Sequence, residues 1–214
     1  MRFLKLSIVC IIIFFCTSFS EAADDWEFWP DNTVKVKLND RTSLNFLEEF
    51  HMRKDMSSFY TYALYAGAYV KINEYLDTAV WYKFVEFKSG SDWHASHRYD
   101  IDGILKYNLE GFKLSNRSRF ECNFTADSWL YRDRVKVVRE FTIFDWKFTP
   151  YISNEFFFDL SNSDGYDENR ASTGVSTPFV FNTKLTAYYM SRAKKSDDNW
   201  TNANVIGFST GMSF

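Results

Sequence analysis

The sequence predicts an all-β fold, an antiparallel transmembrane β-barrel of about 10–12 strands that follows a cleaved signal peptide. Three observations lead to this prediction. A short apolar segment opens the chain, hydrophobic and polar residues alternate through most of the rest, and aromatic residues make up 20% of the 214 residues. A soluble core of this size could not easily bury 43 rings beside 25% charged residues, whereas a barrel can turn rings toward lipid.

The composition excludes several other classes of protein. With 8 Gly and 3 Pro, the chain has too few of these residues for collagen or a low-complexity linker, and its aromatic content excludes a disordered chain. The mean hydropathy of −0.33 argues against a bundle of transmembrane helices. Without residues 1–22 the formal charge is about −4, from 23 basic and 27 acidic residues, so we expect no nucleic-acid partner.

Residues 1–22 have the organisation of a secretory signal peptide. Two basic residues precede an apolar run over 6–16, and small residues follow, so that cleavage is expected after Ala22. The apolar run is shorter than the roughly 20 residues of a membrane-spanning helix, which argues against a single membrane anchor. We therefore divide the chain into a signal peptide, residues 1–22, and one outer-membrane β-barrel domain, residues 23–214. Cleavage leaves a single cysteine, Cys122, so no disulfide can form within the mature chain.

Alternation of period two is clearest in residues 112–124, where one face is apolar and the other charged, as in a strand. The apolar face carries Phe112, Leu114, Phe120, Cys122 and Phe124, and the other carries Lys113, Ser115, Arg117, Arg119, Glu121 and Asn123. Similar runs give eleven candidate strands, most of them near the 9–11 residues that cross a bilayer at about 45°. They cover roughly residues 34–38, 44–53, 60–72, 75–88, 93–109, 112–124, 129–144, 147–159, 166–176, 179–192 and 199–214.

The connections between these runs alternate in length, as in an outer-membrane barrel with short turns at one end and longer loops at the other. Tight turns are expected at 38–42, 72–75, 109–112, 144–147 and 175–179, and longer polar loops at 53–58, 88–96, 125–128, 161–168 and 194–201. An antiparallel barrel with both termini on one side needs an even number of strands. We therefore expect residues 23–30 to add a strand or thread inside, or one run to lie outside the wall.

Alternation alone does not decide which face is inside, and a lipocalin-like soluble barrel would bury the apolar face. The signal peptide, the terminal Phe214 and the tryptophans near strand ends favour the inverted barrel, because Trp prefers the membrane interface. These tryptophans are Trp26, Trp29, Trp81, Trp93, Trp129, Trp146 and Trp200. Three charges interrupt the apolar face. Asp133 is interpreted as lying near a loop, whereas Glu48 and Arg139 suggest a bulge or a shifted register.

The second half of the chain resembles the DUF2490 family of bacterial outer-membrane β-barrel proteins. The resemblance covers roughly residues 26–214 and is strongest over 100–214. It is carried by residues 116–121 (NRSRFE), 132–134 (RDR), 151–156 (YISNEF) and 167–170 (DENR), with Gly174 and the pair Tyr188 and Tyr189. Asn116 and Cys122 depart from the more basic or polar residues expected at their positions.

This resemblance implies a place in the outer membrane of a Gram-negative bacterium, reached by export through the periplasm. It brings no activity with it. The expected partners are outer-membrane lipid and lipopolysaccharide, and the barrel-assembly machinery, which would read the last strand ending at Phe214.

Charged residues on the expected inner face form the candidate site. They are Arg117, Arg119, Glu121, Arg132, Arg134, Lys136, Glu140, Glu155 and Arg170, with Asp100, Asp102 and Glu168 as possible neighbours. One interpretation is an eyelet for an anionic solute, because Arg presents a planar fork to carboxylate or phosphate. The other is a salt-bridge network that fills a narrow barrel, which the near balance of charges favours.

No pattern points to catalysis, a cofactor or a metal. The pair His94 and His97, with Asp92 and Asp100 nearby, could bind a metal, but exposed loop histidines are the commoner interpretation, and His51 lies on another strand. Asp164, Asp167 and Glu168 lack the spacing of a calcium loop. We therefore expect no enzyme, cofactor or metal site. The expected role is a structural barrel or a narrow channel for small solutes. The alternatives are a lipid-modifying enzyme, such as a lipase or acyltransferase, and an adhesion barrel that binds through loops near Asp164 and Asp198.

Overall fold

The computed structural model describes residues 24–161, 165–196 and 199–214, and every regular element within these ranges is a β-strand. The predicted signal peptide, residues 1–22, lies outside the described residues, as do Asp164 and Asp198 of the predicted binding loops. Within the described ranges no helix has the length and apolar character needed to cross a membrane. The strands are β1 (Asp25–Lys37), β2 (Thr42–Arg53), β3 (Ser58–Lys71), β4 (Leu76–Ser89), β5 (Asp92–Leu109), β6 (Phe112–Asn123), β7 (Ser128–Arg139), β8 (Phe141–Ile143), β9 (Trp146–Asp159), β10 (Tyr166–Pro178), β11 (Thr183–Ser196) and β12 (Asn199–Ser213).

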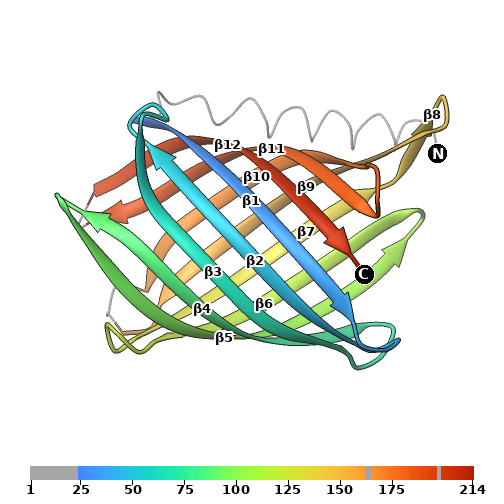
Figure 1. The fold of residues 1–214 in the computed structure, drawn as a ribbon, viewed down its shortest axis with the longest axis horizontal. Helices are drawn as coiled ribbons and strands as arrows, with labels where there is room; N and C mark the ends of the chain where they lie inside the picture. Colours follow the sequence, from blue (N-terminus) through green and yellow to red (C-terminus); the bar gives the residue numbers. More distant parts are fainter. Residues whose placement is uncertain (1–23, 162–164, 197–198) are drawn as a thin grey trace.

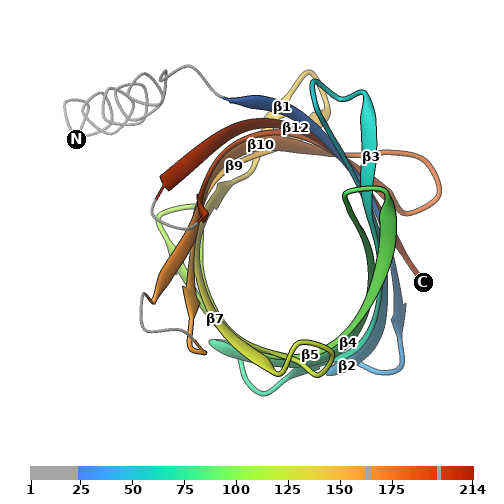
Figure 2. The same ribbon diagram turned by 90° about the vertical axis from the view of Figure 1, so that its left-hand side faces the viewer.

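Eleven of these strands close into a single barrel, seen from the side in Figure 1 and along its axis in Figure 2. Neighbouring strands of the wall pair antiparallel, except at the seam, where β1 and β12 run parallel from Asp25↔Ala203 to Lys35↔Ser213. The short β8 pairs with β9, and the hairpin of these two strands extends beyond the wall. The predicted all-β barrel of 10–12 strands is confirmed.

The expectation of an even strand number is wrong, because a parallel seam closes a barrel of odd number. Residues 25–30 neither add a strand nor thread inside, since they form the first part of β1 in the wall. Each of the eleven predicted runs supplies one wall strand. The run at 129–144 is interrupted after Arg139, where β7 ends and β8 follows.

The barrel has two rims, which we name after the ends of the chain. The N-terminal rim is where β1 begins at Asp25, and the C-terminal rim is where β12 ends at Ser213. The predicted difference in loop length between the two ends of the barrel is wrong, because strands extend into the predicted long loops. For example, only residues 90–91 connect β4 and β5. The longest hairpin instead projects from the C-terminal rim (Figure 1), and its turn residues Phe144 and Asp145 have φ of 49° and 66°.

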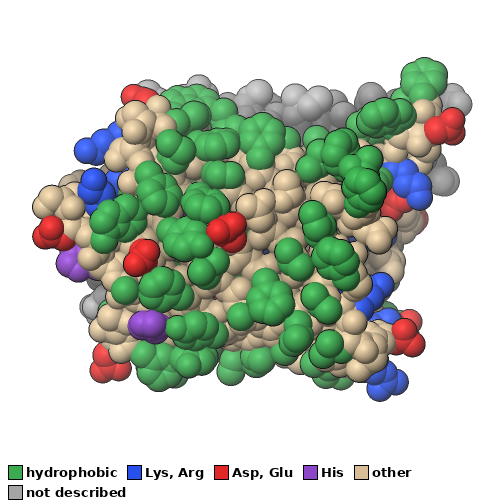
Figure 3. Space-filling view, in the orientation of Figure 1, with side chains coloured by type: hydrophobic (Ala, Val, Ile, Leu, Met, Phe, Trp, Pro, Cys, Tyr) green, Lys and Arg blue, Asp and Glu red, His purple; other side chains and the backbone are tan. Residues whose placement is uncertain are grey.

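The wall is apolar outside and charged inside, which is the inverted arrangement. Ten of the eleven wall strands expose a large apolar side chain at mid-strand, including Val80, Ile101 and Phe120, each more than half exposed. Figure 3 shows hydrophobic side chains spread over the face of the wall in view, with isolated acidic groups among them. Of the carboxylates on the inner face, Glu27, Asp77, Asp100, Asp102, Glu121, Glu155 and Glu168 are buried. A lipocalin-like barrel would have the opposite polarity.

Three aromatic residues turn into the barrel, and two of them are tryptophans predicted at the membrane interface. Trp29 is buried inside, and Trp81 also points inward, where its Nε1 donates to Asp102 at 3.1 Å. Tyr60 enters the interior because a bulge in the β2–β3 pairing, beside His51 and Met52, shifts the alternation of β3. The prediction of Trp at the interface therefore fails for the two tryptophans that sit at inward positions of their strands.

The interrupting charges occupy regular outward positions and are satisfied locally. Asp133 lies in the middle of β7, not near a loop, and accepts hydrogen bonds from Asn116, Ser118 and Tyr131 at 2.8, 3.0 and 3.1 Å. The register is unbroken at Glu48, which accepts a hydrogen bond from Tyr62 at 3.0 Å. Arg139 ends β7 at the C-terminal rim, with its guanidinium over the rings of Phe112 and Phe141. The bulge predicted for Glu48 and Arg139 is absent at both.

Candidate functional site in the barrel lumen

The inner face of the wall encloses a cavity of about 760 Å³. Eight of the nine predicted site residues line it because they alternate inward on β6, β7, β9 and β10: Arg117, Arg119, Glu121, Arg132, Arg134, Lys136, Glu155 and Arg170. The ninth, Glu140, is placed elsewhere. The strand ends at Arg139, so Glu140 sits at the C-terminal rim, 3.5 Å from Lys113, beside a second cavity of about 680 Å³.

Arg119 on β6 joins two buried carboxylates of the neighbouring strand β5. Its Nη1 lies 2.7 Å from Asp100 Oδ2, and its Nε and Nη2 donate to the two oxygens of Asp102 at 2.6 and 2.8 Å. A planar guanidinium matches a carboxylate in this two-bond geometry, which is among the strongest side-chain pairings. These three side chains therefore lock β5 to β6 on the inner face.

Arg132 on β7 continues the pairing across the next strands. It lies 3.0 Å from Glu155 and 3.5 Å from Glu121. Glu121 also pairs with Arg98 at 2.6 Å, and Glu155 with Arg117 at 2.6 Å. Charges of alternating sign thus run from β5 to β9, and a solute could reach these arginines only in competition with the protein's own carboxylates.

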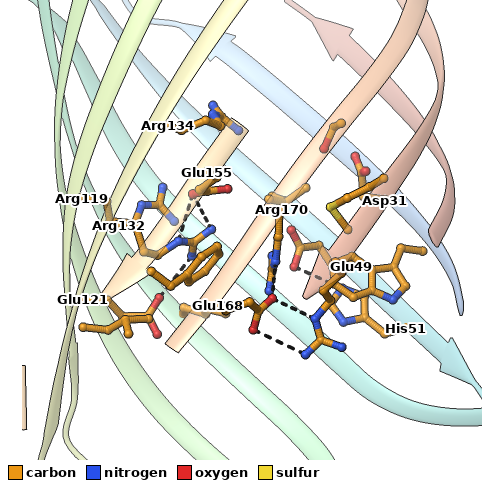
Figure 4. A pocket seen from close by; sticks show the side chains of 18 of the residues that line it. Asp31, Glu49, His51, Arg119, Glu121, Arg132, Arg134, Glu155, Glu168 and Arg170 are labelled. Carbon is orange, nitrogen blue, oxygen red and sulfur yellow. Dashed lines mark hydrogen bonds and ion pairs between the residues drawn. The ribbon is translucent and has the colours of Figure 1, made fainter. Parts of the chain in front are cut away.

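A second group of ion pairs links β10, β11 and β1. Figure 4 labels Glu168 and Arg170 of this group. Glu168 accepts from Arg170 Nε at 2.5 Å and from Arg192 Nε at 2.8 Å, and Arg192 Nη1 lies 3.1 Å from Glu27. Because Glu27 is on β1 and Arg192 on β11, this group reaches past β12 and supports the parallel seam from inside.

Aromatic rings support this second group. Trp29 donates its Nε1 to Glu27 at 2.7 Å and stacks on His51 with ring centroids 3.9 Å apart. The guanidinium groups of Arg170 and Arg192 lie over the Trp29 ring, at 5.0 and 5.7 Å from its centroid. Cation–π contacts of this kind hold a guanidinium in place when it is removed from water.

Arg134, Lys136 and Lys184 form a separate group among the cations that line the lumen. They lie toward the C-terminal rim, and no carboxylate of the described residues comes within 4.0 Å of their nitrogen atoms. Lys136 instead lies over the ring of Tyr151, 3.8 Å from its centroid. The lumen therefore has a half near the N-terminal rim that is rich in ion pairs, the ion-paired half. We call the half near the C-terminal rim the cationic half, because these three cations lack such a partner there, although Lys106 and Asp77 pair at 2.6 Å at the same rim.

Glycines in the wall let large rings lie flat against it and so keep the cavity open. A Cβ on Gly207 would lie 1.9 Å from Cζ of Tyr188, and one on Gly174 would lie 2.7 Å from Cε1 of Tyr151. Gly67 takes the same role under Trp81, whose Cε3 would be 2.4 Å away. With any larger residue at these three positions, the ring would have to move into the lumen.

Several lumen residues were not among the predicted site residues. Glu27, Lys83, Arg98, Lys184 and Arg192 all occupy inward positions, and alternation within their own strands was the signal that could have found them. Alternation within a strand does not predict the register between strands. Only the register brings Arg192 to Glu168 and Glu27, or Arg98 to Glu121.

The histidines are scattered and do not form a site together. His51 faces the lumen beside Trp29 and Glu49, whereas His94 and His97 are exposed on β5 and His97 bonds the Tyr82 hydroxyl at 2.7 Å. Among the described residues, no cluster of three or more His, Cys, Asp or Glu side chains has an arrangement that could hold a metal ion. In the same part of the chain, the contacts of His51 include no serine hydroxyl.

Comparison with known proteins agrees with the resemblance found in the sequence. The model of one protein family, DUF2490, described as a protein of unknown function, matches residues 26–203. This range runs from the start of β1 into β12 and so includes most of the barrel wall. No curated protein matches the chain. The chain therefore belongs to the DUF2490 family.

Proposed function

We propose that this chain is an outer-membrane β-barrel that forms a narrow channel for small solutes. The observation that carries the proposal is the inverted wall, with large apolar side chains outside and buried charges inside. An exposed apolar surface around a whole barrel is unfavourable in water, whereas lipid is its natural surrounding.

The dimensions of the wall suit a bilayer. Strands such as β2 and β3 have 12 and 14 residues. At ~3.3 Å per residue and a tilt of ~40°, such strands rise roughly 30–35 Å, enough for the ~25 Å apolar band of an outer-membrane barrel. Four tryptophans, Trp26, Trp93, Trp129 and Trp200, are exposed at the N-terminal rim, where an interfacial girdle is expected.

The interior supports a narrow passage. The cavity of about 760 Å³ has lining residues at both ends of the wall, from Asp167 and Lys194 near the N-terminal rim to Ser176 and Lys184 near the C-terminal rim. The ion pairs of Arg119, Arg132 and Arg192 reduce its width in the N-terminal half. A passage constricted by charged groups favours small, hydrophilic solutes.

The localisation and partners follow from the same proposal. Residues 1–22 would direct export to the periplasm, and the barrel would then insert among outer-membrane lipid and lipopolysaccharide. Phe214 would be presented to the barrel-assembly machinery. Its backbone continues the parallel pairing with β1 through Lys35 and Lys37, at 2.9 Å in both bonds, while its ring is exposed.

Electrophoresis and planar-bilayer recording test the two parts of the proposal separately. The mature protein, refolded in detergent, should migrate differently before and after boiling, and should show stepwise conductance in planar bilayers. Arg134→Ala should shift ion selectivity toward cations, whereas Lys71→Ala, at an exposed position outside both cavities, should not.

Each negative result has its own meaning. Unchanged migration on boiling would overturn the membrane barrel itself. Heat-modifiable protein without conductance at any voltage would overturn the channel and leave a structural barrel, closed by its ion pairs.

A further inference from the structure

The cationic half of the lumen contains positive charges that form no close ion pair with the described residues, although Glu155 lies opposite Arg134 in the β7–β9 pairing. Arg134 and Lys136 point inward from alternate positions of β7, and Lys184 points inward from β11. In the described part of the chain these three have no carboxylate within 4.0 Å, although Arg117, Arg119 and Arg132 beside them are all paired. Uncompensated charges inside a barrel are costly, so their presence requires a reason.

Positive groups predominate around Lys136. The charged groups that act on it most strongly are Arg134, Lys184 and Arg117, all of them cations. Among the described residues, the buried Nε of Arg117 has no hydrogen-bond partner, and the pairing of Arg117 with Glu155 uses Nη2 instead. Mutual repulsion among these groups falls when an anion lies between them.

The walls around these cations supply hydroxyl groups. Ser153, Ser172, Ser176, Thr186 and Ser209 line the same cavity, together with the phenol of Tyr151. One carboxylate, Asp31, also lies here, and it accepts a hydrogen bond from Ser209. Hydroxyl donors and cations together are suited to an oxyanion, whose oxygens accept several hydrogen bonds at once.

Access from outside passes Lys184. This side chain lines both the lumen cavity and the second cavity at the C-terminal rim, which Lys37 and Lys147 also line. Cations at the mouth of a passage raise the local concentration of anions. Lys184, Lys136 and Arg134 thus lie in order along a path from the rim inward.

We propose that Arg134, Lys136 and Lys184 form a binding site for a small, multiply charged oxyanion of the phosphate type. Arg offers a planar fork to two oxygens, and each Lys adds a point charge. A dianion should therefore bind more strongly here than a monocarboxylate. The inference rests on the proposed channel for its physiological meaning, because a solute must reach the lumen. Binding itself can be measured without transport.

Calorimetry on the refolded, full-length mature barrel in zwitterionic detergent tests the site. Inorganic phosphate is titrated into the wild type, Arg134→Gln, Lys184→Gln and the matched control Lys71→Gln. Each variant must retain heat-modifiable migration. We expect phosphate binding to weaken about tenfold in each site variant, as for the loss of one charged hydrogen bond, and to be unchanged in the control.

A second arm uses a short-chain phosphatidic acid and separates two sources of the phosphate group. Phosphate binding that the site variants weaken assigns a free oxyanion, whereas binding of the lipid alone, weakened by the same variants, assigns a headgroup. Equal affinity in all four proteins, or no heat with either ligand, would overturn the site. A conducting barrel without binding overturns the site alone, and a binding barrel without conductance overturns the channel alone.

Discussion

The two halves of the lumen are made from the same kinds of residue but differ in how charge is compensated. Near the N-terminal rim, Arg119, Arg132 and Arg192 each meet two carboxylates, and these contacts cross-link strands of the wall. Near the C-terminal rim, Arg134 meets none within 4.0 Å among the described residues. The difference shows that an inward arginine can cross-link strands of the wall or make no ion pair at all, depending on which side chains face it.

This contrast separates stability from binding. Removing one partner of a buried ion pair leaves an uncompensated charge and costs much of the stability of a small protein. Removing a cation that has no partner relieves repulsion instead. Substitutions in the ion-paired half should therefore lower stability, whereas substitutions in the cationic half should change binding and ion selectivity. The expected effects follow from the largest to the smallest.

The largest effect is expected for Arg119→Ala in the ion-paired half. Asp100 and Asp102 would remain buried without their counter-charge, and the free energy of unfolding should fall by about 3–5 kcal/mol. Urea titration of the refolded barrel, followed by tryptophan fluorescence, measures this change. The same substitution at Arg134 is the control, and equal losses at both positions would contradict the contrast.

The next effect is expected for Gly207→Ala on β12. The added Cβ would meet the Tyr188 ring at 1.9 Å, so the ring must shift into the lumen, at a cost of about 1–3 kcal/mol. The single-channel conductance should fall as well. Gly103→Ala is the matched control, because nothing lies within 4 Å of its added Cβ. Full conductance in Gly207→Ala would show that Tyr188 does not border the passage.

A small effect on stability and a clear effect on selectivity are expected for Lys136→Gln. Its charge has only cations as strong neighbours, so the free energy of unfolding should change by less than about 1 kcal/mol. The reversal potential in a salt gradient should shift toward cation selectivity. A large loss of stability would show that Lys136 supports the fold, as the paired charges of the other half do.

The smallest effect is expected from salt. Raising the ionic strength from 0.1 to 1 M shortens the Debye length from about 10 to about 3 Å, but buried pairs are screened much less than exposed charges. Phosphate binding at the cationic half should therefore weaken several-fold, while the unfolding midpoint in urea barely moves. Calorimetry and urea titration at the two salt concentrations measure both, and a parallel loss would contradict the distinction.

The alternation of residues was enough to predict the barrel and most of its strands. Arg117, Arg119 and Glu121 point inward because β6 keeps its period of two without interruption. Where that period is broken, alternation no longer indicates the face. Tyr60 turns inward at a bulge, and the predicted lumen residue Glu140 lies past the end of β7. Breaks of this kind depend on neighbouring strands and leave no mark in the local pattern.

The predicted placement of two tryptophans is wrong because it rests on the residue type and not on the position in the strand. Trp29 and Trp81 were assigned to the membrane interface as tryptophans, although they share an inward parity with Glu27 and Lys83. The parallel seam was missed for another reason. It joins Asp25 to Ala203, at opposite ends of the chain, and no local sequence feature reports so distant a pairing.

The seam also decides the sidedness of the two termini. A barrel of even strand number returns its last residue to the side on which it began, but here β1 and β12 run in the same direction. In a membrane, Asp25 and Phe214 would therefore lie on opposite sides. If the assembly machinery holds Phe214 at the periplasmic side, the residues just before β1 are carried through the bilayer and emerge at the cell surface. A peptide epitope placed there would be a surface display site, whereas one placed after Phe214 would stay hidden.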